Sequence, residues 1–148
     1  HATDDPAANL ARGLNAARQA ARDGAELICF AELAFTRFYP QTPAGPESHR
    51  WGEPVPGPTT EAFSRLAREL GVVVVLNLYE NPGGNGPCYD CSPVIDGDGS
   101  QTVEEPLKPC GVSHDRRIAE PEPLVGDALA RVRELGLGLL DGCLKFLF

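Results

Sequence analysis

One stretch decides the fold: residues 24–32 read GAELICFAE, with an apolar run held between a glycine and a glutamate. The run is too short for a helix and directly follows a helical pattern, so we predict a buried strand over residues 25–30. Glu32 comes at the carboxyl end of that strand, where open α/β sheets carry their functional sites. On position alone, a solvated loop carboxylate remains the alternative interpretation of Glu32.

Amphipathic helices are predicted on either side of this strand. Residues 5–23 and 59–70 both carry apolar side chains at helical spacing. The start and stop signals are Asp5 and Gly24 for the first helix, and Thr59 or Thr60 and Gly71 for the second.

Two further strands follow the second helix. Residues 72–78 are almost entirely apolar or β-branched, as in a central strand, and residues 89–96 form the third predicted strand. The alternation of helix and strand indicates an α/β layer. We expect residues 25–30 and 72–78 to be neighbours in one sheet, with both helices on one face. Residues 72–79 and 89–96 should form an antiparallel hairpin.

The remaining segments are less regular. Residues 40–58 contain six prolines and three glycines, and a connection of this length is typical of functional or disordered segments. After residue 102 the periodicity fades, and only residues 128–135 again favour a helix. A polar start without methionine suggests that the sequence is a fragment and carries no intact secretory signal.

Composition narrows the classes of partner. The chain has 148 residues, 42% of them hydrophobic, enough for the core of one domain, and a net charge of -8 that disfavours nucleic acids and anionic membranes. No apolar run approaches the roughly 20 residues of a membrane helix. An odd number of cysteines at irregular spacing is poorly suited to a disulfide framework and favours a reducing cytoplasm. The five are Cys29, Cys88, Cys91, Cys110 and Cys143.

The motifs match a known pattern in order. Residues 24–40, GAELICFAELAFTRFYP, resemble the first signature of the nitrilase superfamily of carbon-nitrogen hydrolases, GA-x-L-I-x-F-P-E-L, with Ala31 in place of proline. The E-L-A-x-T-x-F-Y-P version is most similar to carbamoyl-amino-acid amidohydrolases. Residues 57–60, 70–75 and 89–99 are similar to later segments of that family, the last of which reads Y-N-S-x-x-x-I-D-x-D-G. The resemblance is good over residues 1–101 and weak over 102–148, within one partial domain.

The resemblance implies both a fold and a catalytic set. The fold is a four-layer α-β-β-α sandwich, represented here by its amino-terminal half, without its first strand and its carboxyl-terminal half. Glu32 matches the general base, Lys108 follows at about the spacing of the catalytic lysine, and Cys143 at that of the nucleophile. Residues 107–109 replace the usual R-K-x-H context and Lys145 stands at an aspartate position. The alternative interpretations therefore remain that Lys108 is an ordinary surface lysine and that Cys143 is an unreactive thiol in the core.

The implied chemistry needs no metal or cofactor. The thiolate attacks an amide, carbamoyl or, less favourably, nitrile carbon, the glutamate moves protons, and the lysine holds the developing negative charge until a thioester forms and is hydrolysed. We expect a partial site, with Glu32 in place and at least one partner displaced. This chain alone should therefore show little or no hydrolysis of a small amide or carbamoyl substrate.

Two alternatives from other classes stay open. The first is a small zinc-binding module, because the spacing of four potential ligands weakly resembles a zinc site: Cys88, Cys91, Cys110 and His114. Strand alternation argues against it, since it would turn the side chains of the first two cysteines to opposite faces of a strand. The second is a catalytically inactive nitrilase-like fragment whose surface serves only to bind other protein chains. A homo-oligomer is compatible with both this hypothesis and that of an enzyme.

Overall fold

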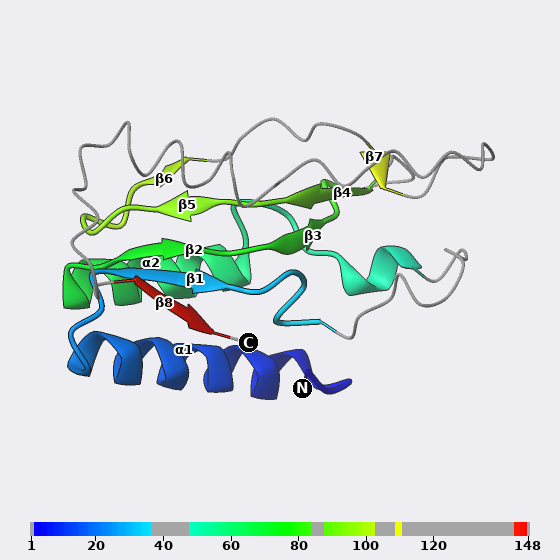
Figure 1. Ribbon diagram of the computed structural model, residues 1–148. Coiled ribbons are helices and arrows are strands. Elements are labelled where there is room, and N and C mark those ends of the chain that lie inside the picture. The colour runs from blue at the N-terminus through cyan, green and yellow to red at the C-terminus, as the bar shows by residue number, and fades with distance from the viewer. Residues whose placement is uncertain (1, 37–47, 84–87, 103–108, 111–143, 148) are drawn as a thin grey trace, which may run out of the picture.

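Two α-helices and eight short strands make up the part of the chain that the computed structural model describes, residues 2–36, 48–83, 88–102, 109–110 and 144–147 (Figure 1). In chain order the elements are α1 (Pro6–Arg22), β1 (Leu27–Phe30), the 3-10 helix η2 (Ser48–Trp51), α2 (Pro58–Leu70), β2 (Val73–Val75), β3 (Leu78–Glu80), β4 (Cys88–Cys91), β5 (Val94–Ile95), β6 (Gln101–Thr102), β7 (Pro109–Cys110) and β8 (Leu144–Leu147). Neither described α-helix is both long and apolar enough to span a bilayer.

The larger of two sheets has the strand order β6-β5-β2-β1-β8. β1 pairs in parallel with β2 on one side, where Ile28 lies opposite Val74, and with β8 on the other. Parallel neighbours need a long crossover connection, and α2 lies within the one that joins β1 to β2. The prediction that these two segments are sheet neighbours is confirmed for β1 and β2, but residues 72–78 do not form one strand, because the strand ends at Val75 and Leu78 begins β3 in the smaller sheet.

One antiparallel hairpin runs through both sheets. β2 pairs with β5 in the larger sheet and β3 with β4 in the smaller, and the same register holds in both pairs, so that Asn77 falls opposite Ser92. Pro93 interrupts the ladder because it has no N–H to donate, although its carbonyl accepts a 3.1 Å hydrogen bond from the Leu76 N–H. The predicted hairpin is confirmed, but residues 89–96 form two short strands rather than one.

Helix α1 begins as its sequence predicts. A carboxylate oxygen of Asp5 accepts hydrogen bonds from the backbone N–H groups of Ala7 (3.0 Å) and Ala8 (3.1 Å). These bonds satisfy two of the amides that lack a partner in the first turn. The N-cap prediction for Asp5 is confirmed.

The start of α2 corrects our prediction. Its N-cap is Gly57, not Thr59 or Thr60, because Pro58 has the fixed backbone angle that suits the first helical position. The Thr60 hydroxyl instead accepts a 2.9 Å hydrogen bond from the Gly57 N–H and lies 3.1 Å from the Gly57 carbonyl. At the other end, Gly71 takes a left-handed conformation (φ 66°), as its role of terminator requires.

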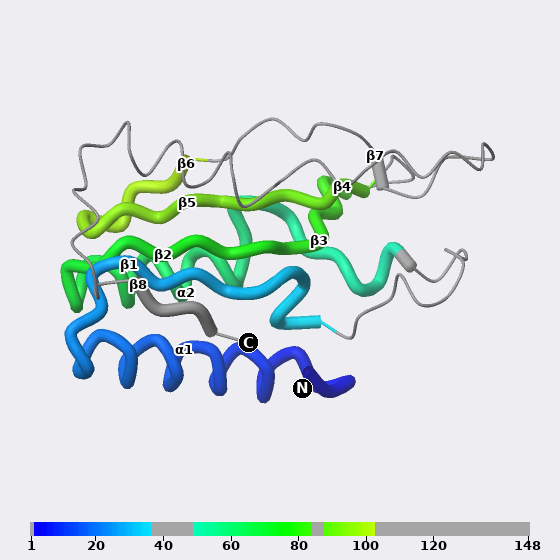
Figure 2. The backbone as a smooth tube through the Cα atoms, viewed as in Figure 1, coloured from blue at the N-terminus to red at the C-terminus, as the bar shows by residue number. Residues whose placement is uncertain are grey.

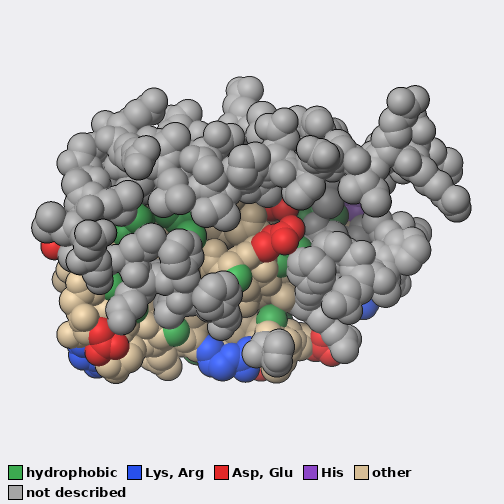
Figure 3. Space-filling view, viewed as in Figure 1, with side chains coloured by type: hydrophobic (Ala, Val, Ile, Leu, Met, Phe, Trp, Pro, Cys, Tyr) green, Lys and Arg blue, Asp and Glu red, His purple; other side chains and the backbone are tan. Residues whose placement is uncertain are grey.

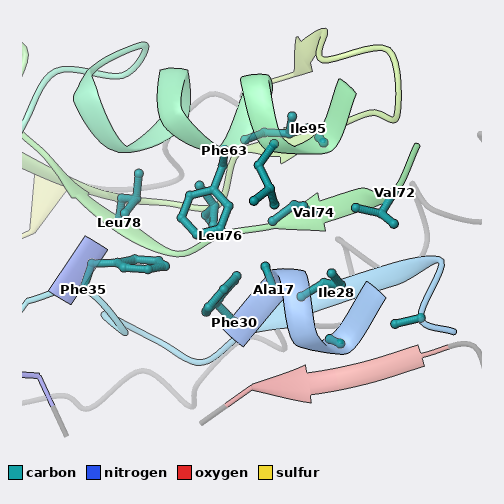
Figure 4. Close-up of a cluster of buried hydrophobic side chains, with 14 of the residues drawn as sticks. Ala17, Ile28, Phe30, Phe35, Phe63, Val72, Val74, Leu76, Leu78 and Ile95 are labelled. Carbon is teal, nitrogen blue, oxygen red and sulfur yellow. The ribbon is translucent and has the colours of Figure 1, made fainter. Parts of the chain in front are cut away.

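The main core lies between the larger sheet and the two helices (Figure 4), whose backbone arrangement is traced in Figure 2. Phe30, Phe35 and Phe63 form its aromatic centre, with ring centroids 4.9 to 5.3 Å apart. Strand alternation turns a second set of side chains, which includes Leu27 and Val73, to the opposite face. Both helices therefore cover one face of this sheet, as predicted. The helix predicted over residues 128–135 lies outside the described residues.

Candidate active site

Glu32 lies just beyond the carboxyl end of β1, in a turn of residues 32–35. Its side chain is exposed, whereas Leu33 and Phe35 in the same turn are 3% and 5% exposed. The strand and the turn thus place Glu32 at the carboxyl end of β1, as the sequence indicates, and the buried side chain of the next residue, Leu33, anchors the turn.

The turn is held at two points. The Leu33 N–H donates a 2.8 Å hydrogen bond to Oδ1 of Asn77, and the Phe35 carbonyl accepts a 2.9 Å bond from Nδ2 of Asn9 on α1. Leu33 has φ 50°, a left-handed conformation that is unfavourable for a residue with a branched side chain. Such a conformation persists only where the surroundings determine it, as these two anchors do here.

Asn77 was not among the residues that the sequence pointed to, yet it connects several parts of the site. It lies between β2 and β3, is 7% exposed, and donates through Nδ2 to Oδ1 of Asp90 (2.7 Å) and to Oγ of Ser92 (3.1 Å). The available signal was one amide inside the apolar run 72–78, because a buried polar side chain must find partners.

Two carboxylates share this region. Partial burial raises the pKa of Glu32, and the negative charge of Asp90 raises it further. Burial also raises the pKa of Asp90, while the hydrogen bond from Asn77 acts in the opposite direction. Each carboxylate therefore holds a proton more readily than it would in water, which is the property that a general base needs near neutral pH.

The cysteines with described side chains are poor candidates for a nucleophile. Burial raises the pKa of Cys29, and it raises the pKa of Cys91 to about 12 together with the charges of Glu80, Asp90 and Glu53. Both groups therefore stay as thiols at neutral pH. Cys88 is 2% exposed, and its Sγ lies 3.4 Å from Nδ1 of His49.

Lys108 and Cys143 both lie outside the described residues. The nearest described neighbour of Cys143 is Leu144, the first residue of β8, which lies in register with Leu27 at the amino end of β1. The carboxyl end of β8, at Leu147, lies beside Phe30 at the edge that carries Glu32.

The zinc alternative finds no support. Cys88 and Cys91 belong to two different buried clusters, as strand alternation requires, and so face away from each other. His114 and the side chain of Cys110 are outside the described set. Among the side chains that are described, no group of three or more potential ligands could hold a metal ion.

Sequence comparison identifies the family. The family model for carbon-nitrogen hydrolases matches residues 2–132. An N-carbamoylputrescine amidase of Solanum lycopersicum is 34% identical over 99 residues, which cover 66% of this chain and 32% of the relative. A nitrilase of Paraburkholderia phymatum is 32% identical over 145 residues, 91% of this chain and 42% of the relative. The chain belongs to the carbon-nitrogen hydrolase family and spans about a third to two fifths of the length of these relatives.

Solved structures agree on the fold. A carbon-nitrogen hydrolase from Helicobacter pylori G27 has a TM-score of 0.62 at 22% identity, covering 70% of this chain and 36% of its own. An amidase from Nesterenkonia sp. AN1, solved as a mutant in complex with butyramide, has a TM-score of 0.53 at 22% identity, covering 69% and 37%. The chain thus has part of the nitrilase-type α/β fold, as the motifs implied.

Proposed function

We propose that this chain supplies the general base of an enzyme that hydrolyses linear carbon-nitrogen bonds in amide or carbamoyl compounds. The observation that carries the proposal is Glu32, which a hydrogen-bonded turn holds beyond the end of β1 and whose pKa is raised by partial burial and by the charge of Asp90. The family membership of the chain and its amidase relatives support the same reaction class.

In this proposal Cys143 is the nucleophile and Lys108 stabilises the oxyanion. Glu32 accepts the thiol proton, and the sulfur bonds to the carbonyl carbon while the lysine balances the charge on oxygen. The carbon-nitrogen bond breaks, and the nitrogen leaves with the proton from Glu32. Water, deprotonated by Glu32, then adds to the thioester, and breakage of its carbon-sulfur bond releases the acid and restores the thiol.

A haloacetamide tests the base and the nucleophile together without needing full turnover. Its amide resembles the proposed substrate, and alkylation of a cysteine is read by peptide mass spectrometry. We expect the label on Cys143, at a rate that falls at least about tenfold in Glu32→Gln, because the group that accepts the thiol proton is lost.

Glu61→Gln is the matched control, since Glu61 is an exposed glutamate in the first turn of α2 and lies at neither end of β1. It should leave the labelling rate unchanged. Equal rates in Glu32→Gln and in the wild type, or labelling spread evenly over several cysteines, would contradict the proposal. We also expect ammonia release from amide and carbamoyl compounds by this chain alone to be very low.

The proposed function also indicates what the protein binds and where it acts. We propose a small-molecule substrate and a cytoplasmic location, where Cys29, Cys88 and Cys91 would remain the free thiols that the structure has. A net charge of -8 opposes the binding of nucleic acids and anionic membranes. On the face shown in Figure 3, acidic and basic side chains of the described residues are interspersed rather than gathered into a basic patch.

A further inference from the structure

Asn77 lies at the point where the hairpin passes from one sheet to the other. β2 precedes it in the larger sheet and β3 follows it in the smaller, and Ser92 lies opposite across the hairpin. Its side-chain amide is buried and makes hydrogen bonds in two directions. One goes to the turn after β1, and the others go to Asp90 and Ser92.

The two directions use the two chemical halves of the amide. Oδ1 accepts from the Leu33 N–H, whereas Nδ2 donates to Oδ1 of Asp90 and Oγ of Ser92. An aspartate in this place would have no donors for Asp90, and an aliphatic side chain would have neither function. The arrangement therefore requires the acceptor and the donors of asparagine or a close analogue.

We propose that Asn77 is a positioning residue for Glu32, whose side-chain amide ties the turn that carries this glutamate to Asp90 and so fixes the separation of the two carboxylates. The inference rests on the proposed role of Glu32 as general base. Leu33, the residue after Glu32, has the left-handed conformation that the bond to Asn77 helps to maintain. Without that bond, the turn is free to move away from Asp90.

The electrostatic consequence concerns one pair of groups. Partial burial is the larger cause of the raised pKa of Glu32, and Asp90 is the charged group whose field raises it further. The carboxylates of Glu53 and Glu80 also lie in this region, and their fields act with that of Asp90 on the Cys91 thiol. Fixing the turn beside Asp90 therefore makes Glu32 a stronger base than an isolated surface glutamate.

The first experiment measures whether Asn77 holds the turn. Amide hydrogen exchange should show a protected Leu33 N–H in the wild type, which exchanges at least about tenfold faster in Asn77→Ala because its buried acceptor is gone. The amides of Val74 and Val75 in the larger sheet are the internal control and should keep their protection. Unchanged protection of Leu33 in a folded Asn77→Ala variant would overturn the proposal.

The second experiment measures the electrostatic coupling between the two carboxylates through the titration of Glu32, followed by carbon-13 NMR of its carboxyl group in Asn77→Ala and in Asp90→Asn. In Asn77→Ala the pKa of Glu32 should fall, because the turn is then free to move away from Asp90. Asp90→Asn keeps an oxygen that can accept from Asn77 and removes the negative charge. We expect the pKa of Glu32 to fall in this variant while Leu33 stays protected. Because Asp90→Asn retains the hydrogen-bond acceptor, it keeps the proposal testable even if Asn77→Ala does not fold.

A pKa of Glu32 that is the same in Asp90→Asn and in the wild type would also overturn the positioning role. Neither measurement depends on a nucleophile. If the titration and exchange results hold while the labelling of Cys143 does not respond to Glu32→Gln, the proposed function fails and the positioning by Asn77 stands.

Discussion

Gly13 on α1 packs directly against the ring of Phe35, the residue that closes the turn after Glu32. A Cβ added at Gly13 would come 2.3 Å from Cε1 of Phe35, far inside van der Waals contact. Phe35 in turn contacts Phe30 and Phe63, so the missing side chain sets how closely α1 approaches the aromatic centre of the core.

Gly13→Ala is therefore expected to destabilise the fold by about 1–3 kcal/mol, because the added methyl group overpacks the core. Urea unfolding measures the free energy. In a Phe35→Leu background the same change should cost less or become favourable, since the ring is gone and alanine has the higher helix propensity. An equal cost in both backgrounds would show that the contact with Phe35 is not the cause.

Asp5→Ala should lower the free energy of unfolding by about 1 kcal/mol through loss of the two hydrogen bonds to the first turn of α1. Thermal or urea unfolding gives the value. Asp5→Ser is the matched variant, because a serine hydroxyl can also accept from these amides, and it should recover most of the stability. Equal losses in the two variants would rule out the capping interaction as the cause.

The Asp90 carboxyl should make stability depend on pH. Burial raises the pKa of Asp90 in the folded state. Its contribution to the free energy of unfolding is therefore fully present below the pKa that Asp90 has in the unfolded chain, and it is lost as the pH rises through the pKa in the folded protein. Asp90→Asn removes that loss. The variant should therefore gain stability relative to the wild type as the pH is raised from about 4 to 7. Urea unfolding at a series of pH values tests this, and a difference that does not vary with pH would be inconsistent with it.

Cys91 should resist alkylation in the folded protein. With a pKa of about 12 and 3% exposure, its thiol is almost wholly protonated and covered at pH 8. Iodoacetamide followed by peptide mass spectrometry should find Cys91 unmodified in buffer and fully modified in urea. Rapid labelling of Cys91 under native conditions would mean that β4 opens readily.

Local signals predicted much of the architecture. Asp5 and Gly71 mark helix ends because each satisfies a backbone requirement within a few residues, and the apolar strands 25–30 and 72–78 indicate burial on both faces. The cap of α2 was predicted wrongly, because Pro58 moves the start of the helix to Gly57. Two threonines that look like caps are instead inside the helix.

The site was less accessible to sequence analysis. The position of Glu32 after β1 follows from the strand pattern alone. The interaction of Asn77 with Leu33 joins residues 44 positions apart, and no local rule predicts such a pairing. The roles of Lys108 and Cys143 remain predictions, since the structural description does not extend to them.

The shared register of the two strand pairs limits where this hairpin can gain or lose residues during evolution. A single insertion between Cys91 and Val94 would slip the pairing of β3 with β4 by one residue and exchange the faces of Asp90 and Cys91. The carboxylate would then point away from Asn77, with the thiol in its place. Variation in length is compatible with the site only at the tip, between Glu80 and Cys88, so homologues that keep this arrangement should differ in length there and not along the arms.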